Sequence, residues 1–158
     1  MAHQLGIKEA KRRAGRLCAL RERSSQEIAD KVKSWGLSER ECKEIVDLFI
    51  REGLVDEQRF ANAYCHDKFE FNSWGKQKIK WHISPHKISS AILEKSLSEI
   101  DPKKYKHRLY ELAQKKWDGL HKEEDQKKKQ KTISYLIGKG FEHDLIGAAI
   151  NSLSEKSH

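Results

Sequence analysis

His82 and His86 are the residues of this chain whose type and spacing most resemble a metal site. They stand four residues apart, and on a continuous helix this spacing brings two imidazoles to one face, as in zinc sites. Pro85 lies between them and disfavours a continuous helix, and no cysteine or carboxylate is nearby in the sequence to complete a tetrahedral ligand set. We therefore expect no metal at this pair and no cofactor.

The three cysteines, Cys18, Cys42 and Cys65, do not form a ligand or redox motif either, because they contain no Cys-x-x-Cys pair. Each falls on the apolar stripe of a predicted helix, where a free thiol behaves as a small core residue. The chain begins MAHQLGIKEAKRRAGR, without the apolar core of a signal peptide, and no run approaches the roughly 18 apolar residues of a membrane span. We expect a cytoplasmic protein with reduced thiols and no membrane partner.

Signatures of catalysis are also missing from the sequence. It contains no P-loop, no nucleophile elbow and no glycine-rich dinucleotide fingerprint. The Gly-Lys-Gly stretch at 138–140 ends a predicted helix instead of following a strand, so we interpret it as a helix cap. We expect a protein that is not an enzyme and has no small-molecule substrate.

Charge is more informative than any of these groups. The 158 residues carry a formal net charge of +8, and 35% of them are charged against 37% that are hydrophobic. This composition favours a thin, surface-rich helical protein with an acidic or nucleic-acid-containing partner. The candidate contacts are the clustered cations Arg12, Arg13, Arg16, Lys76, Lys78, Lys80, Lys87, Lys127, Lys128, Lys129 and Lys131.

The positive charge is unevenly distributed. Residues 24–57 hold five Lys or Arg against nine Asp or Glu, a net of −4, whereas residues 73–88 hold four lysines and no acid, a net of +4. A solvated helix face explains any one cluster, and we favour that interpretation for KEEDQKKKQK at 122–131. Within 73–88, Trp74 and Trp81 could stack on bases, but core packing is the expected fate of at least one of them.

The elements that would carry these groups are helices. Apolar residues recur at helical spacing almost throughout, and no segment alternates as a strand would. Residues 8–53 are predicted to form three short helices. Their start and end signals are two capping-box patterns and two C-cap glycines, at Ser24 with Glu27, Ser38 with Glu41, Gly36 and Gly53.

The same plan appears three times along the chain. QEIADKVKSWGL at 26–37 aligns with QKIKWHISPHKI at 77–88 and with QKTISYLIGKGF at 130–141. The register points are Gly36, Lys87 and Gly140, which are 51 and 53 residues apart. Because repeats of this length stack to bury their apolar stripes, we predict an all-α fold. Its expected form is an elongated array of three tandem three-helix repeats, at 8–53, 54–98 and 101–153.

The stretch GLVDEQRFA at 53–61 is predicted to join the first two repeats. Asp56 would cap the next helix, Leu54 and Val55 would pack over the joint, and Phe60 would pack beneath Gly53 and Leu54. An ordinary helix–turn–helix connection within a single bundle explains these residues equally well in isolation. Asp101 followed by Pro102 is the corresponding start signal of the third repeat.

With the repeats laid out, the sequence resembles the RecX family of bacterial regulators, from about residue 8 to residue 153. LRERSSQEIADKV is similar to the first-repeat signature, and GLVDEQRFANAY to the family's Gly-Tyr-Leu-Asp-Asp-x-Arg-Phe-Ala motif. SWGKQKI resembles the Tyr-Gly-x-x-x-Ile element, and YLIGKGFEHDLI the third-repeat ending. The positions that match as structural motif residues are Gly53, Leu54, Asp56, Arg59, Phe60, Gly75, Ile79, Gly140 and Phe141.

Three positions depart from the family pattern. Trp74 stands where the family usually has Tyr, Glu57 occupies the second acidic position, and Lys87 stands where the family tends to have Gly. The last departure bears on the geometry of the second-repeat turn.

The resemblance implies a function in recombination. RecX proteins are regulators of the RecA recombinase, thought to lie in the helical groove of the RecA–single-stranded DNA filament and to modulate its recombinase, ATPase and co-protease activities, with inhibition the expected direction. This would place the chain in homologous recombination, DNA repair and the SOS response. Wedging between filament lobes and competition for a second DNA path are both open as mechanisms.

The alternative is a basic helical DNA-binding module that acts without RecA. A recognition helix would need exposed base-reading residues near its N-terminus. Only residues 89–98, SSAILEKSLS, are placed to supply one, and their types suit that role poorly.

Overall fold

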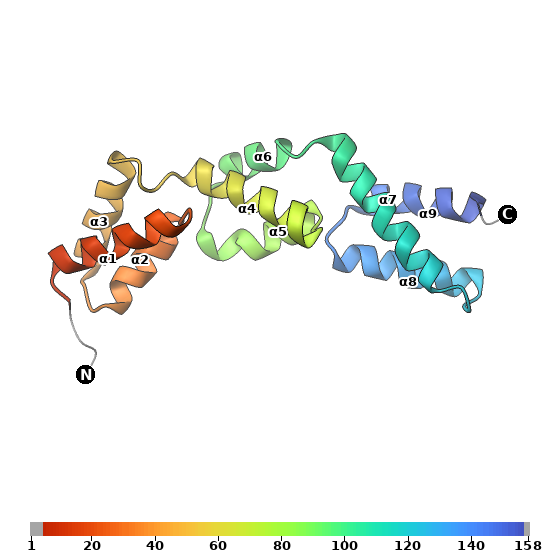
Figure 1. Ribbon diagram of the computed structural model, residues 1–158, viewed down its shortest axis with the longest axis horizontal. Coiled ribbons are helices and arrows are strands. Elements are labelled where there is room, and N and C mark those ends of the chain that lie inside the picture. The colour runs from red at the N-terminus through yellow and green to blue at the C-terminus, as the bar shows by residue number, and fades with distance from the viewer. Residues whose placement is uncertain (1–4, 157–158) are drawn as a thin grey trace. The chain divides into compact units, whose positions relative to one another are not determined.

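The computed structural model describes residues 5–156, and within this range the fold is all-helical, as predicted. No strand occurs among these residues, and no helix in them is long and apolar enough to cross a membrane. Figure 1 shows the order of the elements. They are α1 (Ile7–Leu20), α2 (Ser25–Ser34), α3 (Glu39–Arg51), α4 (Glu57–Asn72), α5 (Lys76–Ile83), the 3-10 helix η1 (Ser84–His86), α6 (Ser90–Ser98), α7 (Pro102–Gly119), α8 (Asp125–Gly138) and α9 (His143–Lys156).

The helices begin where the capping signals place them. Ser24 and Ser38 each accept a hydrogen bond from the backbone of the third helical residue, and the glutamate there accepts one in return, so both capping boxes are complete. Asp56 accepts a hydrogen bond from the Arg59 backbone at 2.9 Å and so caps α4. Asp101 caps α7, whose first residue is Pro102.

The chain packs as two compact units. The first contains residues 5–64 together with Ile83–Ser96. Here α1, α2 and α3 contact one another and enclose one apolar cluster. A second cluster in this unit is formed by Phe60, Ala61 and Ile83, with Tyr64, Ile88, Ile92 and Leu93 packed around it.

The second packing unit contains Cys65–His82 and residues 97–156. In it α7, α8 and α9 contact one another pairwise. Its fully buried side chains include Leu97, Leu109, Leu136 and Ile146. The three repeats predicted from the sequence do not coincide with these two packing units. The boundaries of the repeats stay a prediction.

The register proposed for the repeats is reflected in the backbone. Gly36, Lys87 and Gly140 all adopt the left-handed conformation, with φ of 92°, 55° and 95°. Lys87 does so despite its Cβ, at a cost of roughly 1 kcal/mol relative to glycine. The aligned positions Ile28, Ile79 and Thr132 are all fully buried. The departure at Lys87 therefore leaves the turn geometry of the repeat intact.

The joint at 53–61 differs from the prediction in two respects. Val55 is buried, but Leu54 is 38% exposed. Phe60 is buried in the cluster of Ala61 and Ile83, so its packing partners come from later in the second repeat instead of from Gly53 and Leu54. The physical reason is that Phe60 shares a face of α4 with Tyr64, one turn on, and this face meets η1 and α6. Arg59 reaches back instead, donating to the Gly53 carbonyl at 3.0 Å and pairing with Glu22 at 2.5 Å.

Candidate interaction surface

The lysines of α5, with the aromatic residues within this helix and just before it, give α5 a basic and aromatic exterior, which we call the α5 surface. Lys68 and Lys78 place their ammonium groups 5.0 and 4.9 Å from the centre of the Trp74 ring. Lys76 lies 5.1 Å from the centre of the Tyr105 ring. The residues of the surface are Lys68, Trp74, Lys76, Lys78, Lys80 and Trp81.

The two tryptophans have different environments. Trp74 is half-buried and packs against His82, with ring centres 4.5 Å apart and ring planes tilted by 37°. Trp81 meets His82 edge-on at 4.8 Å and is 73% exposed. Core packing was expected for at least one of these tryptophans, but neither lies in the buried core: Trp74 is half-buried against His82, and Trp81 presents its ring to solvent.

His82 and His86 do not share a helix. The α5 helix ends at Ile83, Pro85 lies in η1, and the chain then turns through left-handed Lys87. While His82 contacts the tryptophans, the Nδ1 atom of His86 is hydrogen-bonded to the Ser24 hydroxyl at 2.8 Å. Among residues 5–156, no three His, Cys, Asp or Glu side chains are arranged to hold a metal ion.

The N-terminus of α5 is held by the third repeat. The backbone N–H groups of Gly75 and Gln77 donate to the carbonyls of Lys139 and Gly140 at 2.7 and 2.9 Å. The Lys76 N–H donates to the Tyr105 hydroxyl at 2.9 Å. These three backbone N–H groups, which the start of a helix leaves unpaired, are thereby satisfied, and the N-terminus of α5 is fixed in position.

Tyr105 is the buried link in this contact. Its hydroxyl accepts the Lys76 N–H and donates to the Glu142 carboxylate at 2.6 Å. Burial raises the pKa of Tyr105, and the hydrogen bond to Glu142 raises it further. The phenol is therefore neutral at physiological pH and acts as both donor and acceptor.

The C-terminus of α4 is held from the same side. Arg108 donates to the Phe69 carbonyl at 2.8 Å and to the Ser73 hydroxyl at 3.0 Å, and its guanidinium lies over the Phe69 ring. Lys139 donates to the Asn72 carbonyl at 2.8 Å. Burial, with the nearby charge of Lys78, lowers the pKa of Lys139.

Sequence reasoning missed the residues that hold the α5 surface. Nothing in the sequence distinguishes Tyr105, Arg108, Lys139 or Glu142 from other residues of the predicted helices. The signal that the sequence offers for this contact is the pair of motif glycines, Gly75 and Gly140. A Cβ on Gly75 would lie 2.3 Å from the Gly140 carbonyl carbon, so both glycines mark a close backbone approach.

The other predicted basic clusters are partly neutralised by nearby acids or engaged with rings. Arg12 and Arg13 both pair with Glu9, whose pKa falls to about 2 because of hydrogen bonds from these two arginines. Lys131 pairs with Glu123 at 2.5 Å, and Lys128 lies over the Trp117 ring at 5.1 Å.

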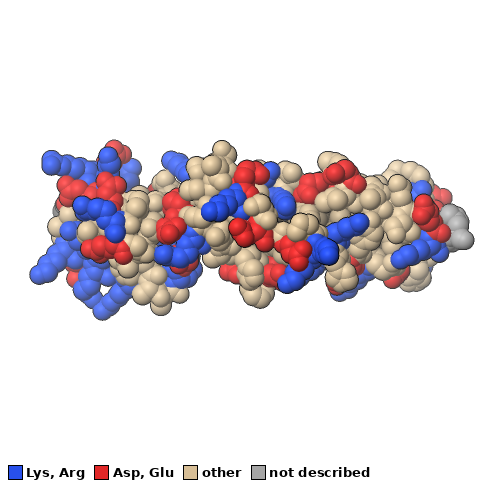
Figure 2. Space-filling model, turned by 90° about the horizontal axis from the view of Figure 1, so that it is seen from above, with Lys and Arg blue, Asp and Glu red and all other residues tan. Residues whose placement is uncertain are grey.

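The predicted cations are divided between the two packing units. Arg12, Arg13, Arg16 and Lys87 belong to the first packing unit, and the α5 lysines and Lys127–Lys131 to the second. On the face drawn in Figure 2, basic and acidic side chains are interspersed. The α5 surface is therefore distinguished by its tryptophans and its lack of acids in 73–88, and not by a general excess of positive charge.

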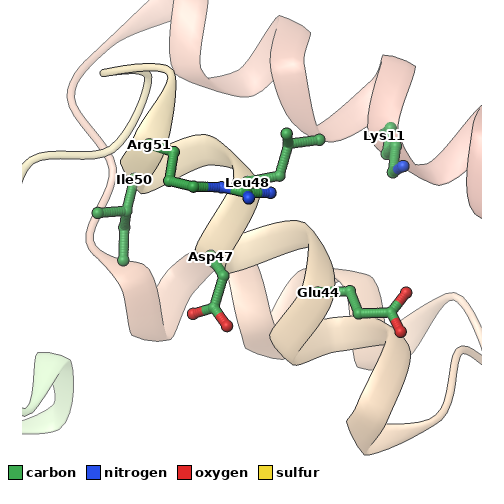
Figure 3. Close-up of a pocket in the computed structure, with 6 residues that line it drawn as sticks. All are labelled: Lys11, Glu44, Asp47, Leu48, Ile50 and Arg51. Atoms are coloured by element: carbon green, nitrogen blue, oxygen red, sulfur yellow. The ribbon is translucent and has the colours of Figure 1, made fainter.

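The first repeat contains a hollow that the sequence did not predict. It has a volume of about 680 Å³ and lies between α1 and α3. Figure 3 shows Leu48 between Arg51 and Lys11, with Glu44 and Asp47 along the other side of α3. Its mixed charges suit contact with a protein surface better than contact with phosphates.

The fold defines a class: an all-helical protein built of tandem three-helix repeats. Two family models match the chain, the second three-helix domain of RecX over residues 56–97 and the third three-helix domain of RecX over residues 101–150. The chain belongs to the RecX family.

Comparisons with individual proteins agree. A protein of Clostridium perfringens named regulatory protein RecX is 28% identical over 138 residues, which cover 86% of this chain and 64% of that protein. The crystal structure of RecX from Lactobacillus salivarius has a TM-score of 0.86 at 24% identity and covers 94% of this chain and 96% of that one. A second crystal structure of regulatory protein RecX has a TM-score of 0.83 at 19% identity, over 92% of this chain and 71% of that one. These two likenesses show the fold.

The chain spans less than two thirds of the length of the first curated relatives that it matches, 64% for the Clostridium perfringens protein and 58% for a Clostridium botulinum protein.

Proposed function

We propose that this protein is a regulator of the RecA recombinase that binds the RecA–single-stranded DNA filament in its helical groove and inhibits its activities. It would act by binding, without catalysis or a cofactor, in the cytoplasm, and so restrain homologous recombination, DNA repair and the SOS response. Membership of the RecX family is the observation that carries the proposal.

The distribution of charge supports a mixed partner. Residues 24–57 have a net charge of −4, so a strand of bare DNA running along them would be repelled. A nucleoprotein filament offers protein surface as well as phosphates, and it can accept both the acidic first repeat and the α5 surface. Wedging between filament lobes and competition for a second DNA path are both compatible with this arrangement.

The test compares binding to RecA filaments, assembled on single-stranded DNA with a slowly hydrolysed ATP analogue, with binding to the bare strand at the same salt. We expect tighter binding to the filament and inhibition of its ATPase. Equal affinity for filament and bare strand would instead favour the DNA-binding module that acts without RecA.

A charge-reversal series locates the contact. Changing Lys76, Lys78 and Lys80 together to Glu should weaken filament binding and the effect on ATPase, with helix content unchanged by circular dichroism. The matched control reverses Lys127, Lys128 and Lys129, which occupy the stretch interpreted as a solvated face, and it should retain most of the binding. A triple α5 variant that regulates as wild type does would contradict the assignment of this surface.

A further inference from the structure

Trp81 is a large aromatic side chain that the fold leaves in solvent. It is 73% exposed, although α5 carries buried Ile79 and Ile83 on its other face. Burying an indole stabilises a protein substantially, so an exposed one is an informative exception. Among the Phe, Tyr and Trp side chains of residues 5–156, only Phe71, which is 77% exposed, is as exposed as Trp81.

The ring of Trp81 is also supported from behind. His82 meets it edge-on with ring centres 4.8 Å apart, and His82 is itself packed against Trp74 at 4.5 Å with the ring planes tilted by 37°. Lys68 and Lys78 place their ammonium groups 5.0 and 4.9 Å from the centre of the Trp74 ring. These ring contacts restrain Trp81 before any partner arrives, and a restrained ring loses little conformational entropy on binding.

The charge around Trp81 selects the kind of partner. Residues 73–82, the part of this stretch in the same packing unit as Trp81, contain three lysines and no acid. Protein–protein interfaces are depleted of lysine, whereas surfaces for single-stranded nucleic acid combine cations that meet phosphates with aromatic rings that meet base faces. A duplex hides its base faces within the helix stack, so an exposed ring of this kind suits a single strand.

We propose that Trp81 is a stacking platform for the bases of single-stranded nucleic acid, with Lys76, Lys78 and Lys80 positioned for the adjacent phosphates. This inference deepens the proposed function, on which its biological setting rests, by naming the component of the filament that the α5 surface contacts.

The experiment measures the affinity of the full chain for two labelled strands at low ionic strength, an oligothymidylate and a strand of the same length that lacks bases. The wild-type protein should prefer the strand with bases by about tenfold, because stacking contributes about 1–3 kcal/mol per base. Trp81→Ala should bind the oligothymidylate about tenfold more weakly and lose the preference. Trp81→Phe should recover most of it.

Phe71→Ala is the matched control. Phe71 is as exposed as Trp81, but its ring contacts His66, and Asp67 and Glu70 lie in the same turn of α4. It should bind both strands as wild type does. An equal loss in the Phe71 variant would overturn the proposal, because exposed aromatic area in general would then explain the binding.

Three further outcomes would also overturn it: no preference of the wild type for bases, unchanged binding by Trp81→Ala, or a Trp81 variant that is weaker only toward the RecA filament. The last would show that the ring enters a protein pocket. Filament binding by the wild type, measured in parallel, separates this failure from that of the proposed function. If the wild-type protein prefers the strand with bases but does not bind the filament, only the proposed function is contradicted.

Discussion

Gly75 and Gly140 set the close approach on which the α5 surface rests. Gly75 donates its N–H to Lys139, and a Cβ added to Gly75 would meet backbone atoms of Gly140 and Phe141 at 2.3–2.5 Å. A Cβ on Gly140, whose φ is 95°, would lie 2.3 Å from the Cβ of Lys78. Because the obstructing atoms at Gly75 belong to the backbone, no side-chain rotation can relieve the overlap.

Gly75→Ala should therefore destabilise the protein by about 3 kcal/mol or more, measured by urea unfolding. Gly147→Ala is the matched control in the same packing unit, because Gly147 lies within α9 and a Cβ there meets nothing within 4 Å. It should stabilise by about 0.5–1 kcal/mol through helix propensity. Similar effects of the two substitutions would mean that α5 and the α8 end are not in contact.

The buried thiol of Cys65 gives the fold a sensitivity to high pH. Cys65 is 1% exposed, and burial raises its pKa from the usual 9.0 to about 12. Below pH 9 the thiol is neutral in both states. As the pH rises from 9 to 12 it ionises only in the unfolded state, so the stability it contributes is lost over that window.

We expect the free energy of unfolding to fall by up to about 1 kcal/mol more in wild type than in Cys65→Ala between pH 9 and pH 10. The variant starts less stable because of the lost thiol, so the gap between the two proteins should narrow at the higher pH. A constant gap would show that the thiol ionises as readily in the folded state as in the unfolded one.

At the scale of elements, the N-termini of α2 and α3 differ in what their capping residues contact. The Ser24 box at α2 is buried and bonded to His86, and the Ser25 N–H donates to Glu57 at 2.7 Å. Glu27 in this box has a lowered pKa, because hydrogen bonds from Arg21 and the Ser24 backbone outweigh the effect of its burial. The Ser38 box at α3 is exposed.

Ser24→Ala should cost about 2 kcal/mol and Ser38→Ala about 1 kcal/mol in chemical unfolding, although the two sequence motifs are alike. The larger loss follows because removing the Ser24 hydroxyl also leaves His86 Nδ1 without that bond. Equal losses would indicate that the contact between α2 and η1 contributes nothing to stability.

At the scale of the whole molecule, the net charge of +8 is the sum of segments that oppose one another. The positive clusters differ in how far the nearest acid lies along the sequence, and 73–88 lies within a stretch, 71–93, that contains no Asp or Glu. The dependence of binding on salt therefore reports which cluster meets phosphate.

For bare single strands, changing Lys76, Lys78 and Lys80 to Gln should reduce the slope of log affinity against log salt by about 2, since each phosphate contact contributes about 0.7. The same change at Lys127, Lys128 and Lys129 should alter the slope much less. If the two triple variants change the slope equally, phosphates are not confined to the α5 surface.

The sequence by itself determined the elements of this protein. Helical periodicity, the capping boxes and the left-handed positions at Gly36, Gly53 and Gly140 depend on residues within four or five positions of one another, so they can be found by inspection. The basic and aromatic composition of residues 73–88 could likewise be recognised from the sequence.

Only the tertiary structure decided what those elements contact. Arg108 and Lys139 reach Ser73 and Asn72 across 35 and 67 residues, and no local pattern encodes such pairs. The partners of Phe60 and the exposure of Trp81 depend on which helix faces pack together. Periodicity identifies an apolar face but not its neighbour, because many neighbours would bury that face equally well.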